Sequence, residues 1–141
     1  MDCAKVNRSP FAIRDEVALF LKKNKIDVMN LCETDFASSR IAEDFKIEGY
    51  KTYPSTPCNS TGKVRLIMLI KDDVVRHCRV VEDGCSQYFP SKFITVKFPK
   101  SRPYILGGCY REWGSGTEKS IDEQIRRLSQ FEDGIENIVR R

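Results

Sequence analysis

The sequence predicts an α/β domain of the α+β type, in which one mixed, mostly antiparallel sheet carries helices on one face. Three observations support this fold class: an early helix followed by a strand, several short apolar runs separated by turn residues, and a long amphipathic helix near the C-terminus. With 141 residues, of which 40% are hydrophobic and 31% are charged, the chain has the size and composition of one globular domain.

The first third of the chain predicts a helix and then a strand, after a weak strand pattern in residues 1–7. Ser9 is a typical N-cap, and Pro10 is a typical first helical residue. The apolar side chains that follow recur at helical spacing: Ile13, Val17, Phe20 and Leu21. Residues 26–33 are an apolar run of strand length that ends in the carboxylate of Glu33. A second, short helix is expected to begin at Ser38 or Ser39.

Antiparallel strands are predicted in the middle of the chain, where runs of strand length alternate with turns rich in Gly, Pro and Ser. These runs are residues 50–53, 64–70, 74–81, 89–98 and 104–113. Residues 71–73 are expected to form a tight polar turn. The final helix, residues 118–141, has one apolar stripe: Ile121, Ile125, Leu128, Ile135, Ile138 and Val139. Because the strands are apolar on both faces and the helices suffice for one face, we expect self-association through an uncovered sheet face.

Positive charge is concentrated in the middle of the chain. The whole sequence has a formal charge of +4, and residues 49–113 contain eleven basic and five acidic side chains, a net charge of +6. A basic segment of this kind suits a polyanion such as nucleic acid. Solvated strand faces and hairpin tips explain the same charges equally well.

Several classes of protein are excluded by the sequence. No apolar stretch approaches the ~18 residues of a membrane span, and no apolar signal segment follows Met1, so we expect no membrane partner and a nuclear or cytoplasmic, non-secreted protein. The six cysteines form no Cys-x-x-Cys pair, which argues against a zinc site and against a disulfide framework. Cys32 and Cys109 lie in apolar runs and are expected in the core.

Three motifs occur in order along the chain. Asn-Arg-Ser at residues 7–9 precedes the first helix, Ile-Asp-Val-Met-Asn-Leu-Cys-Glu-Thr occupies residues 26–34, and Gly-Gly-Cys-Tyr-Arg-Glu-Trp occupies residues 107–113. This set resembles the endonuclease/exonuclease/phosphatase superfamily and, within it, the endonuclease domain of non-LTR retrotransposon polyproteins, which also contain a reverse transcriptase. The second motif is similar to the family's D-V-L-C-L-T-E-T strand, and the third is similar to its Y-R-E-W strand ending.

The resemblance implies a four-layer α/β/β/α sandwich of two similar halves and Mg²⁺-dependent hydrolysis of phosphodiesters. In that picture Glu33 binds Mg²⁺, Tyr110 is a catalytic residue that positions the phosphate, and Asn7 organises the site. Counting back from Glu33 places Val6 at the family's Asn position, so that Asn7 reaches the site only if the strand contains a bulge. Asp35 is a second carboxylate at the same strand-to-loop junction.

The sequence departs from the family pattern after the third motif. The G-D-F-N and S-D-H motifs are absent, and the one histidine, His77, has no Asp beside it and does not match the water activator. We therefore expect residues 1–141 to be a single partial domain, corresponding to the N-terminal half of an endonuclease domain. We expect this domain to act on DNA in the complete protein and to have little turnover alone. Whether residues 1–141 by themselves are an enzyme is left open. The alternative is a non-catalytic module, derived from that domain, that binds nucleic acid or a protein.

Overall fold

The computed structural model of the chain describes residues 10–58, 61–81, 90–110 and 121–140. Their helical elements are the 3₁₀ turn η1 (Pro10–Ile13), α1 (Arg14–Lys23), α2 (Ser39–Glu43), α3 (Asp72–Val75) and α4 (Ile121–Val139). Their strands are β1 (Val28–Phe36), β2 (Tyr50–Pro54), β3 (Val64–Lys71), β4 (Cys78–Val81), β5 (Ser91–Val96) and β6 (Tyr104–Cys109). The strand predicted at residues 1–7 and the N-cap predicted at Ser9 lie outside the described residues.

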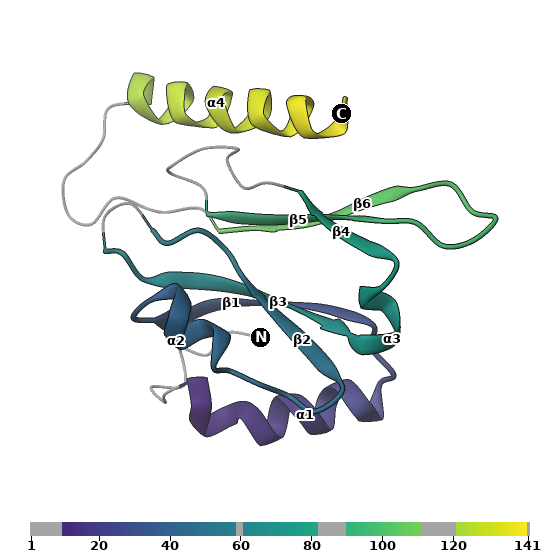
Figure 1. The fold of residues 1–141 in the computed structure, drawn as a ribbon. Helices are drawn as coiled ribbons and strands as arrows, with labels where there is room; N and C mark the ends of the chain where they lie inside the picture. The colour runs from purple at the N-terminus through teal and green to yellow at the C-terminus, as the bar shows by residue number, and fades with distance from the viewer. Residues whose placement is uncertain (1–9, 59–60, 82–89, 111–120, 141) are drawn as a thin grey trace.

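The strands form two antiparallel three-stranded sheets, with the orders β1-β3-β2 and β4-β5-β6 (Figure 1). The predicted combination of helices with antiparallel strands is confirmed. The prediction of a single sheet is wrong, because the strands that follow residue 77 pair only with one another among the described strands. We refer to the two sheets as the first sheet and the second sheet.

A short helix explains why the chain builds a second sheet. Residues 74–81 were predicted as one strand after a polar turn, but α3 takes up the first part of this segment and β4 begins only at Cys78. Asp72 and Asp73 lie in the first turn of α3, where carboxylates are favoured by the exposed backbone N–H groups. The helical turn redirects the chain after β3, so that β4 does not extend the first sheet.

Helices α1 and α2 cover one face of the first sheet. Val17 and Leu21 of α1 are buried against Leu31 of β1 and Leu69 of β3 in one apolar cluster. The cap predicted at Ser38 is present, because its Oγ accepts a hydrogen bond from the backbone N–H of Ile41 at 3.2 Å. Of the predicted apolar stripe, Ile13, Val17 and Leu21 are buried, whereas Phe20 is exposed.

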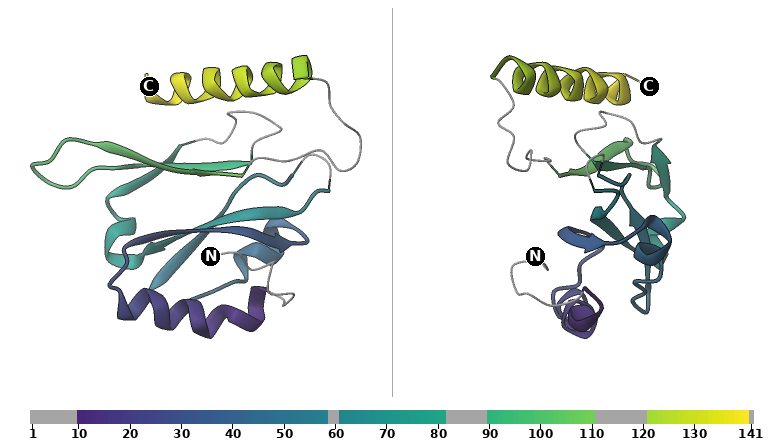
Figure 2. Two further views of the ribbon diagram at one scale, coloured as in Figure 1. Left: turned by 180° about the vertical axis from the view of Figure 1, so that it is seen from behind. Right: turned by 90° about the vertical axis from the view of Figure 1, so that its left-hand side faces the viewer.

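The other face of the first sheet packs against the second sheet (Figure 2). Met68 and Ile70 of β3 are buried together with Ile94 and Val96 of β5. The sheet face that the sequence analysis expected to be bare is therefore covered by β-structure from the same chain. The physical reason is that β3 is apolar on both faces. Helices α1 and α2 cover one face, and the inner face of the second sheet covers the other.

Helix α4 lies on the outer side of the second sheet (Figure 1). Its C-terminal part makes this contact, because Ile138 is buried and Phe131 and Ile135 pack near Val81 and Phe93. The remaining large apolar side chains of the helix are exposed: Ile121, Ile125, Leu128 and Val139. Among the described residues, no helix has the combination of length and apolar character that crossing a bilayer requires.

Candidate functional site

The end of β1 that contains the predicted metal ligand is irregular. Pairing between β1 and β3 is regular as far as Cys32 and resumes at Phe36, so that residues 33–35 of β1 lie opposite the single residue Arg65 of β3. An irregularity of this kind bends the strand and changes the direction in which its side chains point. It places polar side chains at the end of the first sheet.

Two residues of this bulge have an unusual backbone conformation. Glu33 has a φ of 55° and Asp35 has a φ of 60°, both in the left-handed region that residues with a side chain rarely adopt. Thr34, which lies between them, is buried, and its hydroxyl donates a hydrogen bond to the carbonyl oxygen of Val64 at 3.0 Å. This bond ties the bulge to β3 and holds the two carboxylate residues on either side of it.

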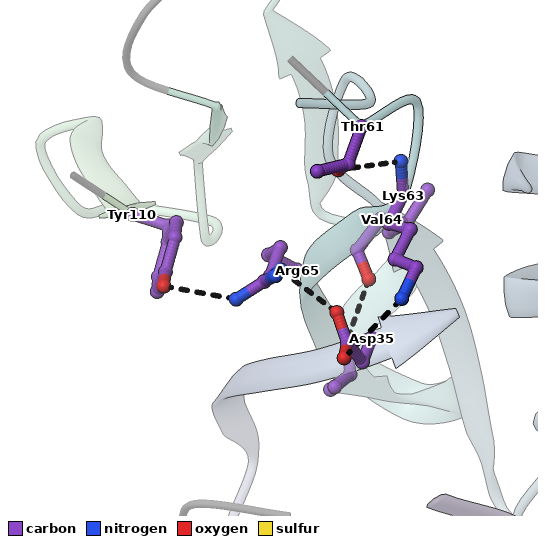
Figure 3. A network of polar contacts seen from close by, with 7 residues as sticks. Asp35, Thr61, Lys63, Val64, Arg65 and Tyr110 are labelled. Atoms are coloured by element: carbon purple, nitrogen blue, oxygen red, sulfur yellow. Dashed lines mark hydrogen bonds and ion pairs between the residues drawn. The ribbon is translucent and has the colours of Figure 1, made fainter. Parts of the chain in front are cut away.

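Arg65 is the centre of the polar contacts at this end of the sheet (Figure 3). Its Nε lies 2.8 Å from Oδ1 of Asp35, and Nζ of Lys63 lies 3.7 Å from Oδ2 of the same carboxylate. The Nε and Oδ1 atoms are misaligned for a hydrogen bond, so this contact is an ion pair. The carboxylate of Asp35 thus forms ion pairs with both Arg65 and Lys63.

Arg65 also joins the two sheets. Its Nη1 donates to the hydroxyl oxygen of Tyr110 at 3.2 Å, and the guanidinium carbon lies 5.6 Å from the centroid of the Tyr110 ring (Figure 3). Burial lowers the pKa of Arg65, but the neighbouring Asp35 and Tyr110 raise it by more, so that its pKa lies above the ordinary value. The guanidinium is therefore charged at every physiological pH.

Tyr110 is held at the end of the second sheet by its backbone. It directly follows β6, and its N–H donates to the carbonyl oxygen of Pro90 at 2.8 Å, which continues the pairing of β6 with β5. Because its hydroxyl oxygen accepts the bond from Arg65, the hydroxyl proton is free to donate to another acceptor. The side chain thus offers a donor beside a charged guanidinium.

The structure brings some of the predicted site residues to one end of the two sheets. Glu33 and Asp35 lie inside β1, which continues to Phe36, so the strand end predicted at Glu33 is wrong. Tyr110 directly follows β6, and Arg65 contacts both Asp35 and Tyr110. Asn7, the third predicted site residue, lies outside the described residues. His77 follows α3, where its ring packs against Phe98 at 4.9 Å between centroids.

The described side chains do not fit a complete Mg²⁺ site. No group of three or more His, Cys, Asp or Glu side chains is arranged to hold a metal ion within residues 10–58, 61–81, 90–110 and 121–140. Asp35 is already paired with Lys63 and Arg65, and Glu33 is the other carboxylate of the bulge. A single carboxylate needs waters and phosphate oxygens to complete the octahedral shell of Mg²⁺.

Sequence reasoning missed Arg65, and it was wrong about Cys109. The one signal for Arg65 was a charged residue inside the otherwise apolar run at residues 64–70, opposite the strand that ends in Glu33. Cys109 was expected in the core but is exposed, because β6 is an edge strand. Cys32 is partly buried.

Two open grooves lie elsewhere on the described surface. One of about 890 Å³ follows β2 and α2, and another of about 620 Å³ lies between α1 and the start of β2. Neither is lined by Glu33, Asp35, Arg65 or Tyr110. The candidate site is therefore a polar cluster at the end of the sheets, separate from both grooves.

No family model, no curated protein and no solved structure matches this chain.

Proposed function

We propose that the chain is a phosphate-binding part of a phosphodiester hydrolase domain of the endonuclease/exonuclease/phosphatase type, most similar to a retrotransposon endonuclease. In the complete active site its substrate is DNA, Glu33 is a Mg²⁺ ligand and Tyr110 positions the phosphate. Residues 1–141 lack the G-D-F-N and S-D-H motifs, so we expect little turnover from them alone. No family match supports this proposal, which depends on the motifs and on the polar cluster.

One observation carries the proposal. Arg65 contacts Asp35 at the end of the strand that contains Glu33, and it also contacts Tyr110 at the end of the last strand, 45 residues away from Arg65 in the sequence. The two motifs that resemble the family are defined by the sequence alone and do not depend on this contact. Residues that share a substrate must lie close together in space, and this contact between the two motif regions supports a shared site.

The chemistry of the cluster suits a phosphate group. The charged guanidinium of Arg65 and the ammonium of Lys63 attract an anion, and the hydroxyl of Tyr110 has a proton to donate. Asp35 neutralises one of the two positive charges and fixes the direction of the Arg65 side chain. The layers do not add to this support, because two sheets stack between α1 and α4 (Figure 1) where the resemblance to half of a sandwich implies one sheet.

The second candidate function is a non-catalytic module that binds nucleic acid. The observation that favours it is the engagement of Asp35 by Lys63 and Arg65, because a carboxylate held by two cations is a poor metal ligand. The basic character of residues 49–113, with a net charge of +6, favours the same reading. The two functions differ in whether Mg²⁺ changes the DNA.

Binding of DNA tests a property that both functions require, and Mg²⁺-dependent cleavage would support the hydrolase alone. We expect fluorescence anisotropy to show binding of a short DNA duplex that weakens as salt is raised. Replacing Arg65→Ala should weaken this binding by about 10-fold, because a charge-assisted bond contributes roughly 1.5 kcal/mol. The matched control is Arg79→Ala, which removes an exposed arginine of β4 and should change the affinity by less than about 2-fold.

Nicking of supercoiled plasmid in Mg²⁺ is the second measurement. Nicking that Glu33→Gln abolishes would establish the hydrolase function for these residues themselves. Salt-dependent binding without nicking, in wild type and Glu33→Gln alike, agrees with the partial hydrolase and with the binding module. Absence of salt-dependent DNA binding, or equal affinities for Arg65→Ala and Arg79→Ala, would overturn both.

A further inference from the structure

We infer that the free edge of β6 is a docking surface for a second copy of this chain, with which it forms one continuous antiparallel sheet. Among the described strands β6 pairs with β5 alone, and it ends the order β4-β5-β6. This association uses a strand edge, in contrast to the sheet face that the sequence analysis expected. It is independent of the proposed function.

The pairing register shows which backbone groups of β6 point away from β5. Tyr110 donates its N–H to the residue directly opposite, Pro90, so the two form a hydrogen-bonded pair. Every second residue along β6 from Tyr110 therefore faces β5. The N–H and C=O groups of the residues between them point outward: Ile105, Gly107 and Cys109.

The residues that bear these outward groups are exposed. Ile105 is 37% exposed, and Gly107 and Cys109 are also exposed. Gly107 has no side chain, so its exposure is exposure of the backbone itself. One face of Gly107, not its outward edge, is covered by the ring of Phe93, the residue opposite on β5. A Cβ at position 107 would lie only 2.3 Å from a carbon of this ring.

Nothing in β6 blocks pairing with another strand. Native edge strands are commonly protected by charged residues, proline or bulges. The segment Tyr104–Cys109 has none of these, and its residues pair with β5 in unbroken register. An uncharged edge of six residues without a bulge is the kind of strand that adds to another sheet.

The free edge of β2, in contrast, is protected against pairing with another strand. The N–H of Ser55 donates to the carbonyl oxygen of Leu66 directly opposite, so every second residue counted back from Ser55 faces β3. The backbone groups of the residues between them, 50, 52 and 54, therefore point outward. The N–H of Tyr50 already donates to the carbonyl oxygen of Ile47, and Pro54 has no N–H. One outward donor, that of Thr52, is left on this edge.

The free edge of β1 is less accessible than that of β6. The N–H of Lys71 donates to the carbonyl oxygen of Asp27 directly opposite, so every second residue of β1 counted from Asp27 faces β3. The residues whose backbone groups point outward are Val28, Asn30 and Cys32. All three are only partly exposed. The edge of β6 therefore combines exposure with a full set of outward donors.

A second copy fits this edge because the edge is complementary to itself. In an antiparallel pair centred on Gly107, Gly107 lies opposite its counterpart and Ile105 lies opposite Cys109 of the second copy. Each copy offers three outward N–H and three outward C=O groups, so that every outward donor finds an acceptor. No charged side chain lies in Tyr104–Cys109, so a twofold axis brings no like charges together.

Sedimentation velocity in a reducing buffer tests the inference. Over a range from low micromolar to several hundred micromolar protein, we expect the weight-average mass to rise from 16.3 kDa towards twice this value. Ile105→Pro removes one outward N–H and leaves the bonds to β5 intact, and it should weaken the association by at least about 10-fold. The matched control Ile105→Val keeps the donor and should associate as the wild type does.

Two further measurements keep the test decisive if Ile105→Pro fails to fold or if the chain associates through another surface. Ile105→Lys places a charge on the same edge and should also weaken the dimer. Hydrogen exchange at the amides of Gly107 and Cys109 should slow as the concentration rises. A monomer at all concentrations, dimers of Ile105→Pro or Ile105→Lys as strong as the wild type, or loss of the dimer in Ile125→Glu on the exposed side of α4 would overturn the inference.

Discussion

Glu33 shows that the candidate site stores backbone strain. Its φ of 55° lies in a region that costs a residue with a side chain roughly 1–2 kcal/mol. Asp35 adopts the same region, which aspartate tolerates better than most residues. The hydroxyl of Thr34 and the ion pair of Asp35 with Arg65 hold this conformation in place. Strain of this kind is concentrated at functional sites.

Two substitutions at position 33 measure this strain. Both Glu33→Gly and Glu33→Ala remove the carboxylate, but only glycine adopts a positive φ without steric cost. We expect Glu33→Gly to have a free energy of unfolding about 1 kcal/mol higher than Glu33→Ala, measured by urea denaturation. In an ordinary strand the order of the two variants is reversed. The reversed order here would show that the left-handed conformation is absent in solution.

The ion pair of Arg65 with Asp35 matters for position more than for stability. The side chains are 26% and 36% exposed, and pairs that solvent reaches contribute at most about 1 kcal/mol. What the pair does is direct the guanidinium towards Tyr110, which lies on the other sheet. A residue of small energetic weight thus determines the geometry of the site.

At the scale of elements, Tyr50 joins the start of β2 to the segment between α1 and β1. Its hydroxyl donates a hydrogen bond to the carbonyl oxygen of Ile26. Burial, Asp27 and Asp73, in that order, raise the pKa of Tyr50 above its ordinary value. The folded state therefore favours the neutral phenol, which is the form that can donate.

The stability of the chain should consequently fall at high pH in a way that depends on Tyr50. Because the folded pKa is raised, the contribution is fully present below about pH 10, the pKa of an unperturbed tyrosine, and is lost as pH rises through the folded pKa. Tyr50→Phe should cost about 1 kcal/mol at pH 8 from the lost hydrogen bond. The difference between wild type and Tyr50→Phe, measured by urea unfolding from pH 8 to pH 11, should shrink above pH 10. A difference that stays constant over this range would contradict the raised pKa.

At the scale of the whole molecule, the two sheets depend on one another. Ile70 of the first sheet and Ile94 of the second are fully buried in the apolar cluster between them. Neither sheet has a second partner for this face among the described residues. We therefore expect the two sheets to unfold together.

Ile94→Ala tests this coupling. The deletion leaves a cavity between the sheets and should lower the free energy of unfolding by about 2–4 kcal/mol. Native-state hydrogen exchange should then accelerate to the same extent in β3 and in β5. The control is Ile125→Ala on the exposed side of α4, where 60% of the residue is accessible and a loss below about 1 kcal/mol is expected. Acceleration confined to β5 would show that the first sheet folds by itself.

Local patterns accounted for much of the structure. The apolar stripe of α1, the cap at Ser38 and the buried run at residues 64–70 each depend on side chains within a few residues of one another, and each was predicted. The division into two sheets was not, because hydrophobic periodicity identifies strands without saying which strands pair. The exposure of Cys109 follows from an edge position that the same pattern cannot indicate.

By itself, the sequence determined the type and order of most elements and predicted the strands near whose ends Glu33 and Tyr110 lie. Only the tertiary structure decided that Arg65 would join the ends of these two strands, that Asp35 would be paired with cations, and that the outward groups of β6 would be exposed. The physical reason is range. Helical and strand periodicity arise from contacts a few residues apart, whereas the site and the strand edges depend on pairings between segments tens of residues apart, which chain entropy and packing settle together.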